Sequence, residues 1–254
     1  INRKVLMSEV AIIIPARMES SRFPRKPLAK LLGREMILHV LDRVTEVANK
    51  EITFVATDSL EISQLVEKSG FQVVMTGDHP TGTDRLAEAN RIINARFVIN
   101  IQGDEPAFNP DDVLTSIEFL KNTGFAAITG FCSATGDLEF QDSNTIKLAY
   151  SRGNRLLYIS RASIPGSKKR NVSNFFRHVC MYGYTSDALS NFAEMPRGTF
   201  ELIEDHELLR FVENDIPVGV VELSDWSVPV DLPGDIALAE KQLKDKFFLD
   251  NFVD

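Results

Sequence analysis

The chain has 254 residues, of which 44% are hydrophobic and 25% are charged, the composition of an ordinary globular protein. Its 36 acidic and 28 basic side chains give a formal net charge of −8, which argues against a nucleic-acid binder or an anionic-membrane binder. The longest apolar stretch, residues 10–15, is far shorter than the roughly 20 residues that a membrane span requires. Two cysteines argue for a reducing compartment, so we expect a cytoplasmic enzyme or small-molecule binder.

The first 125 residues alternate between strand patterns and helix patterns. Short continuous runs of β-branched and aromatic residues predict strands, and apolar residues at helical spacing predict helices. The predicted strands cover residues 10–14, 52–56, 71–75, 97–101 and 125–131, and the predicted helices cover residues 36–47, 60–68, 84–93 and 110–120. This alternation builds βαβ units, so the predicted fold class is α/β, with a mostly parallel, doubly wound, Rossmann-like sheet.

The pattern changes after residue 130. A hairpin with strands at 145–150 and 156–159 is predicted, followed by a polar, basic loop at 166–173. The rest of the chain predicts a strand at 179–184, an amphipathic helix at 199–214, a strand at 218–223 and a helix at 233–247. No linker rich in Gly, Pro and Ser divides the chain. We therefore predict one domain over residues 8–254 with a smaller β-rich lobe, after a tag or disordered start at residues 1–7.

Polar and charged side chains follow several predicted strands. They lie at the carboxyl ends of these strands, where open α/β sheets bind their ligands. The loop after the first strand, residues 15–28, carries four cations, Arg17, Arg22, Arg25 and Lys26. Guanidinium groups and a lysine ammonium suit a polyphosphate, and the alternative is a solvated basic loop. The segment lacks the G-x-x-x-x-G-K-[ST] pattern, so it is not a P-loop.

A carboxylate, Asp104, lies in the turn that follows the predicted buried strand at 97–101, and Gly103 precedes it. Mg²⁺ takes few protein ligands and obtains its other oxygens from substrate phosphates and water. A second acid, Asp231, also follows a predicted strand. Taken singly, each could cap a turn or helix, but together they predict a metal clamp.

The segment from Asp78 to Arg85 enters the helix predicted at 84–93. Its hydroxyls and the free N–H groups of a helix N-terminus could hold the edges of a base or a phosphate. A simple cap by Thr81 or Thr83 is the alternative reading of this segment.

The second lobe carries a further polar set, in which Arg161, His178 and Tyr182 lie at or near the ends of predicted strands. Such groups suit an anionic, hydroxylated ligand. A single histidine beside a strand is more often a structural residue, so His178 is a weaker candidate than Arg161.

These segments, in this order, resemble the CMP-KDO synthetases, the 3-deoxy-manno-octulosonate (KDO) cytidylyltransferases. The resemblance extends from about residue 10 to 240. It rests on P-A-R-x-x-S-x-R-x-P-x-K-P-L at 15–28, A-T-D at 56–58, T-G-T-D-R at 81–85, I-Q-G-D-E-P at 101–106, Y-x-S-R-A-x-I-P at 158–165, R-H at 177–178 and Y-G-Y at 182–184. It implies transfer of CMP from CTP to the anomeric hydroxyl of KDO with release of pyrophosphate, for lipopolysaccharide biosynthesis.

The resemblance also implies roles for individual residues. The catalytic set would be Arg17, Lys26, Asp104 and Asp231, in which the two acids hold Mg²⁺ and the two cations neutralise the triphosphate. The nucleotide would contact Ala16, Arg17, Arg22, Lys26, Thr81, Gly82 and Arg85. The sugar would contact Gln102, Arg161, His178, Tyr182 and Glu207. Residues 8–130 would form the CTP-binding half and residues 131–254 the sugar-binding and dimerisation half of a homodimer.

Departures from the family pattern concern mainly the sugar side. The usual E-Q-L-R reads E-L-L-R here, with Leu208 in place of a glutamine, and Asp205 and His206 are more polar than expected. The usual G-V-D-T-P-E-D reads P-V-D-L-P-G-D at 229–235, and Arg25 stands where glycine is common. The sequence therefore leaves four alternatives for the acceptor, namely KDO, an 8-amino analogue of KDO, another nonulosonic acid and another acidic acceptor. A non-catalytic nucleotide-binding protein is the alternative outside the enzymes.

Overall fold

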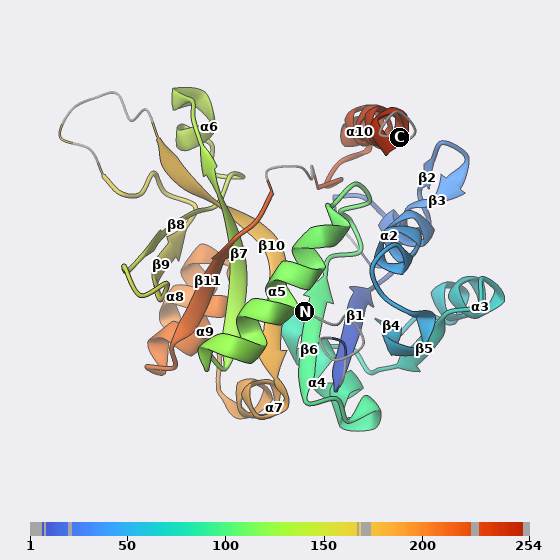
Figure 1. Ribbon diagram of the computed structural model, residues 1–254, viewed down its shortest axis with the longest axis horizontal. Coiled ribbons are helices and arrows are strands. Elements are labelled where there is room, and N and C mark those ends of the chain that lie inside the picture. Colours follow the sequence, from blue (N-terminus) through green and yellow to red (C-terminus); the bar gives the residue numbers. More distant parts are fainter. Residues whose placement is uncertain are drawn as a thin grey trace.

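A computed structural model describes residues 7, 9–19, 22–166, 168, 174–224 and 229–250, with their side chains as far as residue 245 (Figure 1). Most of the expected start at 1–7 and of the basic loop at 166–173 lies outside the described residues. One sheet contains the strands β1 (Val10–Ala16), β4 (Thr53–Thr57), β5 (Gln72–Met75), β6 (Phe97–Ile101), β7 (Ala127–Ala134), β8 (Lys147–Tyr150), β9 (Leu156–Ser160), β10 (Phe175–Thr185) and β11 (Val218–Glu222). A small ribbon, β2 (Lys30–Leu31) with β3 (Arg34–Glu35), stands apart from it.

Helices cover both faces and one end of this sheet. They are α2 (Met36–Thr45), α3 (Leu60–Lys68), α4 (Gly82–Ile93), α5 (Pro110–Thr123), α6 (Asp137–Gln141), α7 (Ser186–Glu194), α8 (Thr199–Glu204), α9 (Leu208–Glu213) and α10 (Ile236–Asp250). Among the described helices, none combines the length and apolar character needed to cross a membrane.

The main sheet has the order β11-β7-β10-β6-β1-β4-β5, and the β8–β9 hairpin attaches to β10. All neighbouring pairs along this order are parallel except those of β10, which runs antiparallel to both β6 and β7. The prediction of an α/β fold with a mostly parallel sheet is therefore confirmed. The predicted hairpin is confirmed as well, because β8 and β9 pair antiparallel.

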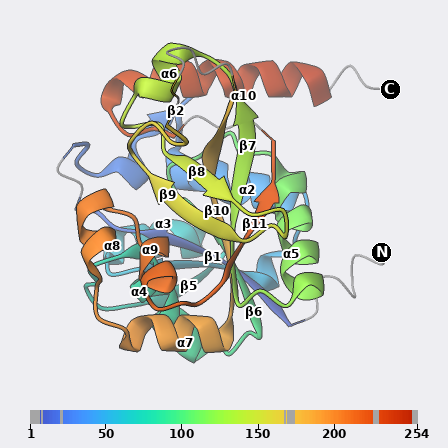
Figure 2. The same cartoon turned by 90° about the vertical axis from the view of Figure 1, so that its left-hand side faces the viewer.

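The alternation of side chains along β1 builds a layer on each face of the sheet. Ile12 and Ile14 pack in one core with α2 and α5, whereas Ala11 and Ile13 pack in the other with α4 and α7. All four residues are almost completely buried. A strand that is covered on both faces is apolar at every position, which is why this segment reads as a continuous run. Figure 2 shows α5 on one side of the sheet and α8 and α9 on the other.

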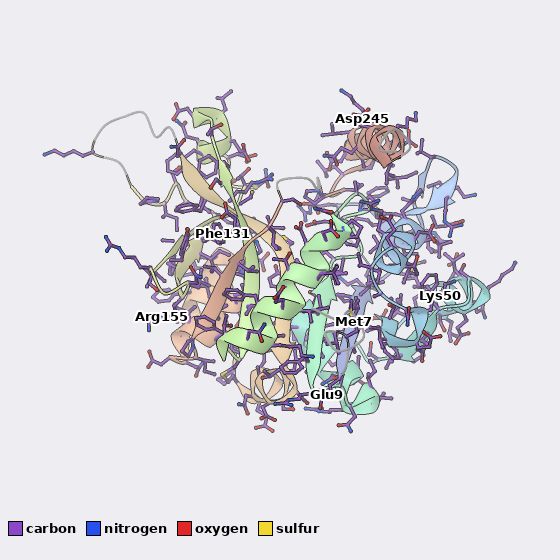
Figure 3. The ribbon with its side chains drawn as sticks, viewed as in Figure 1. Met7, Glu9, Lys50, Phe131, Arg155 and Asp245 are labelled. Atoms are coloured by element: carbon purple, nitrogen blue, oxygen red, sulfur yellow. The ribbon has the colours of Figure 1, made fainter. Side chains whose placement is uncertain are left out.

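A third, smaller core closes the edge at which β1 and β6 end. Here Ala239 and Leu243 of α10 pack on Leu31, Met36 and other residues near the carboxyl ends of the strands. Figure 3 shows Asp245 of α10 at one end of the molecule and Glu9, just before β1, at the other. Helix α10 thus lies at the end where loops from several strands converge.

The structure corrects the prediction of a continuous helix at 199–214. The helix breaks into α8 and α9, because Asp205 has a left-handed backbone with φ of 50°. The carbonyl of Glu204 accepts a hydrogen bond from Nε of Arg161, 2.8 Å away, instead of continuing the helical pattern. This partner comes from a distant part of the chain, so the helical spacing of apolar residues could not reveal the break.

Candidate active site

A cavity of about 310 Å³ opens at the carboxyl ends of β1 and β6. We name it the loop cavity, because the loop after β1 forms one of its walls. All of the residues predicted to bind the nucleotide or the metal line it, namely Ala16, Arg17, Arg22, Lys26, Thr81, Gly82, Arg85, Asp104 and Asp231. The topology therefore brings together residues that are scattered over the sequence.

A second cavity of about 370 Å³ is lined mainly by residues between 144 and 231, and we name it the lobe cavity. Four of the predicted sugar-binding residues line it, Gln102, Arg161, Tyr182 and Glu207. Arg22, Pro80, Thr81, Gly82, Gln102, Asp104 and Asp231 line both cavities. The two predicted metal ligands therefore stand where the two cavities meet.

His178, the fifth predicted sugar-binding residue, lies behind the wall of the lobe cavity. The residue is 7% exposed, and its ring packs against the rings of Tyr182 and His206, with centroid distances of 5.5 and 4.9 Å. Its Nε2 is 2.8 Å from the hydroxyl of Thr129. His178 borders a neighbouring cavity instead. Its contact with a sugar stays a prediction, and the observed geometry has it support Tyr182.

Lys26 connects the two acids at the junction. Its Nζ donates to Oδ2 of Asp104 at 2.6 Å and to Oδ1 of Asp231 at 3.2 Å. Burial lowers the pKa of Lys26, but the two carboxylates outweigh this effect, so the pKa lies above its usual value. The Arg22 guanidinium adds a contact of 3.0 Å to Oδ1 of Asp231. The junction therefore carries two carboxylates neutralised by two cations.

Backbone hydrogen bonds hold Asp231 beside Asp104, although the two are far apart in sequence. The N–H of Val230 donates to the carbonyl of Asp104 at 2.9 Å. The N–H of Asp231 donates to Oδ2 of Asp235 at 2.9 Å, and the N–H of Leu232 donates to the same atom at 2.8 Å. Asp235 therefore orders the turn that presents Asp231.

The donor set at the junction fits Mg²⁺. Asp104 and Asp231 contribute hard carboxylate oxygens that already share one cationic partner, the ammonium of Lys26. The described residues contain no group of three or more His, Cys, Asp or Glu side chains arranged to hold a metal. A site with only two carboxylates suits an ion that completes its shell with substrate phosphates and water.

The expectation that all four loop cations face one polyphosphate site is wrong for Arg25. Its backbone has φ of 59°, a left-handed conformation that explains why a glycine is common at this position. Its guanidinium pairs with the carboxylate of Glu61 on α3. Arg25 borders a different cavity, between the loop and α3, whereas Arg17, Arg22 and Lys26 line the loop cavity.

The start of α4 forms another wall of the loop cavity. Oγ1 of Thr81 accepts from the N–H of Asp84 at 3.1 Å, so Thr81 caps the helix as well as lining the cavity. Arg85 is only 3% exposed and donates to Oδ2 of Asp58 at 2.7 Å and to Oγ1 of Thr76 at 2.6 Å. Asp58, from the A-T-D segment, therefore holds Arg85 in place.

Glu207 links the lobe cavity to the start of α4. Its Oε2 accepts from the N–H of Thr83 at 3.0 Å. Burial raises the pKa of Glu207, and the hydrogen bonds from Thr83 and Thr81 oppose this rise without cancelling it. Because Glu207 touches the helix whose first residues line the loop cavity, one side chain connects the walls of both cavities.

Arg161 is held by hydrogen bonds to residues that the sequence did not identify as part of the site. Oε2 of Glu204 accepts from the backbone N–H of Arg161 at 2.9 Å, and Oε1 accepts from the Ser160 hydroxyl at 2.6 Å. Lys147 is fully buried, and its Nζ donates to the carbonyl of Arg161 at 2.8 Å. Lys147 lies within a predicted strand and carries no local signal of this role.

Leu208 is not among the described residues that line the loop cavity or the lobe cavity. It is fully buried in the core on the α4 and α7 face of the sheet. The departure from the family pattern at this position therefore changes core packing and not the wall of the lobe cavity. Asp205 and His206, the other two unusual residues of this segment, do line the lobe cavity.

Comparisons with known proteins show the family to which this chain belongs. The model of the family described as Cytidylyltransferase matches residues 11–218. The 3-deoxy-manno-octulosonate cytidylyltransferase of Escherichia coli is 35% identical over 228 residues, which cover 89% of this chain and 93% of that protein. The protein of the same name from Syntrophotalea carbinolica is 38% identical over 248 residues, which cover 92% of this chain and 98% of that protein.

A solved structure is also similar over nearly the whole chain. It is a CMP:2-keto-3-deoxy-manno-octonic acid synthetase complexed with CTP, 32% identical, with a TM-score of 0.87. The match covers 94% of this chain and 100% of that chain. The fold, the family model and these relatives agree, and the chain belongs to the cytidylyltransferase family of enzymes.

Proposed function

We propose that this cytidylyltransferase transfers CMP from CTP to the anomeric hydroxyl of KDO and releases pyrophosphate, with Mg²⁺ as its cofactor. The observation that carries the proposal is the position of Asp104 and Asp231, which line both the loop cavity and the lobe cavity. A reaction that joins two substrates needs its charge-stabilising groups at the point where the substrates meet.

CTP occupies the loop cavity in this proposal. Arg17, Arg22 and Lys26 line it with positive charge, in a chain whose net charge is −8. Arg17 and Lys26 neutralise the triphosphate and stabilise the charge that develops on the leaving pyrophosphate, and Arg22 assists them. Thr81 and Gly82 line the same cavity and would border the nucleotide. The similar solved structure is itself complexed with CTP, which supports this assignment.

Arg85 has a different role from the other cations of the loop cavity. Its guanidinium is already paired with Asp58 and almost completely buried. It therefore shapes the start of α4 around the nucleotide and contributes less to neutralising phosphate.

Asp104 and Asp231 would hold Mg²⁺. When bound there, Mg²⁺ supplies a Lewis acid that lowers the cost of ionising the attacking hydroxyl and orients the two substrates. The chain itself positions the reactants and balances their charge, and the reaction requires no covalent intermediate on a side chain.

The acidic sugar occupies the lobe cavity in this proposal. Arg161 provides a cation on its wall, and Gln102, Tyr182 and Glu207 provide groups that can hydrogen-bond hydroxyls. The relatives that match most of the chain are named for KDO, which supports this sugar as the acceptor.

We propose a homodimer in the cytoplasm as the working form. Phe200, Ile203 and Leu157 of α8 and β9 are 49%, 74% and 47% exposed, and Phe200 packs on Tyr158. Exposed apolar side chains on neighbouring elements are typical of an interface between subunits. The two cysteines are free, in keeping with a reducing compartment. Sedimentation equilibrium of the wild type and of Ile203→Asp would test the dimer, and a monomeric wild type would contradict it.

The test of the reaction is pyrophosphate release with CTP and Mg²⁺, using KDO, 8-amino-KDO, sialic acid or no acceptor. The wild type should release pyrophosphate with KDO, and Asp104→Asn should lose about 100-fold or more of this turnover while keeping its fold. Asp187→Asn, at an exposed position at the start of α7, is the matched control and should keep normal turnover. Release only with another acceptor would reassign the lobe cavity. CTP binding without release for any acceptor would overturn the proposal.

A further inference from the structure

His206 lies on the wall of the lobe cavity, between α8 and α9. The residue is 6% exposed, and its Nδ1 is buried without a hydrogen-bond partner. Buried polar atoms are nearly always paired, so an unpaired imidazole nitrogen on a cavity wall indicates a group that a ligand completes.

The surroundings of His206 keep its ring uncharged. Burial and the nearby Arg161 lower the pKa of His206 to about 4, against the opposing effect of Asp205 and Glu204. At neutral pH the ring therefore has one N–H donor and one nitrogen that accepts. A hydroxyl group can pair with either ring nitrogen, because it both donates and accepts. A carboxylate can pair only with the N–H.

The ring is also held in a defined orientation. The ring of His178 packs edge-on against it at 4.9 Å, with an interplanar angle of 77°. The backbone N–H of His206 donates to the carbonyl of Glu201 at 3.2 Å. Since packing against His178 already restricts the ring, a sugar hydroxyl can pair with it at a low cost in conformational entropy.

We propose that His206 is a specificity-determining residue that hydrogen-bonds a hydroxyl group of the acceptor sugar in the lobe cavity. The inference rests on the proposed function and adds a recognition group to its acceptor side. The ring of His178 packs against the rings of His206 and Tyr182 behind the cavity wall.

The test compares His206→Leu and His206→Gln with the wild type in steady-state kinetics with KDO and CTP. Leucine removes both nitrogens, so the KM for KDO should rise about tenfold while the KM for CTP stays within twofold. Glutamine restores a donor and an acceptor at a similar reach, so it should recover part of the loss. Glu194→Gln, at an exposed position at the end of α7, is the control for a surface substitution in this part of the fold.

Singly deoxygenated KDO analogues provide the second measurement. For one of them, the wild type should lose about tenfold in kcat/KM relative to KDO, whereas His206→Leu should accept the analogue and KDO about equally. Unchanged KM for KDO in His206→Leu, or an equal rise in the KM for CTP, would overturn the role of His206. If the wild type itself shows no turnover with KDO, the proposed acceptor is wrong. This outcome is distinct from a wild type that turns over KDO and a His206→Leu variant that does so equally well.

Discussion

The ammonium of Lys26 lies 2.6 Å from Oδ2 of Asp104, so a cation of the chain itself contacts a carboxylate that we propose as a ligand of Mg²⁺. The same ammonium reaches Asp231 at 3.2 Å. Lys26 thus offsets the repulsion between two acids that stand side by side. In the proposed mechanism, Mg²⁺ would give the two carboxylates another cation, and the ammonium would become available to the triphosphate of CTP.

Replacing Lys26 with methionine should therefore have two opposite effects. The affinity for Mn²⁺ in the absence of nucleotide should rise about tenfold, because a competing and repelling cation is gone. Turnover with CTP should fall about 100-fold or more, because the proposed stabilisation of the leaving pyrophosphate by this cation would be lost. Electron paramagnetic resonance would measure free Mn²⁺, and pyrophosphate release would measure turnover.

Lys30→Met is the matched control for this variant. The Lys30 side chain is 65% exposed and lies outside the loop and lobe cavities. It should leave both measurements unchanged. Weaker Mn²⁺ binding in Lys26→Met would contradict the competition between Lys26 and the metal.

The buried histidines should make the protein less stable in mild acid. The pKa of His206 is lowered from about 6.5 to about 4, mainly by burial, so the unfolded state binds more protons between these two values. The free energy of unfolding should therefore rise with pH over this window, by at most about 1.4 kcal/mol per pH unit from this residue. The pKa of His178 is also lowered by burial, so it contributes in the same direction.

Urea unfolding at pH 5, 6 and 7 would measure this dependence. His206→Gln should give a shallower slope than the wild type, because glutamine does not titrate. Equal slopes for the two proteins would show that His206 has an ordinary pKa in the folded state.

Arg210 should be essential for stability. It is 2% exposed and donates to both carboxylate oxygens of Glu201 at 2.8 and 2.7 Å, and to Oδ1 of Asp84 at 3.1 Å. Arg210→Met leaves buried negative charge without its main partner, which costs about 3–5 kcal/mol. Urea unfolding should show this loss, and Arg152→Met, in an exposed turn, should change stability by less than about 0.5 kcal/mol. A loss below about 1 kcal/mol for Arg210→Met would contradict the prediction.

Leu208→Gln, which restores the residue expected from the family pattern, should affect stability and not the acceptor. Leu208 is fully buried in the core, so a glutamine there would bury an amide at a cost of about 1–3 kcal/mol. The KM for KDO should stay within twofold, because position 208 borders neither cavity among the described residues. An acceptor KM that fell with unchanged stability would instead place residue 208 at the sugar.

Much of the fold could be predicted from periodicity. The continuous apolar run at 10–14 and the helical spacing at 36–47 are properties of contiguous residues, and they appear as β1 and α2. The prediction at 199–214 was wrong, because the helix ends where Arg161 takes the carbonyl of Glu204. Helix α7 was not predicted, although Thr185 caps it with a hydrogen bond from Ala188 at 3.2 Å.

The sequence by itself determined the α/β class and the residues from which the candidate site is built, because both follow from local patterns and short motifs. Only the tertiary structure decided which of these residues meet. It turned Arg25 toward Glu61, placed His178 behind Tyr182, and brought His206 to the lobe cavity. Lys26 pairs with Asp231 across 205 positions, and Arg210 pairs with Asp84 across 126. Such pairs depend on how whole elements dock, and no local pattern encodes that docking.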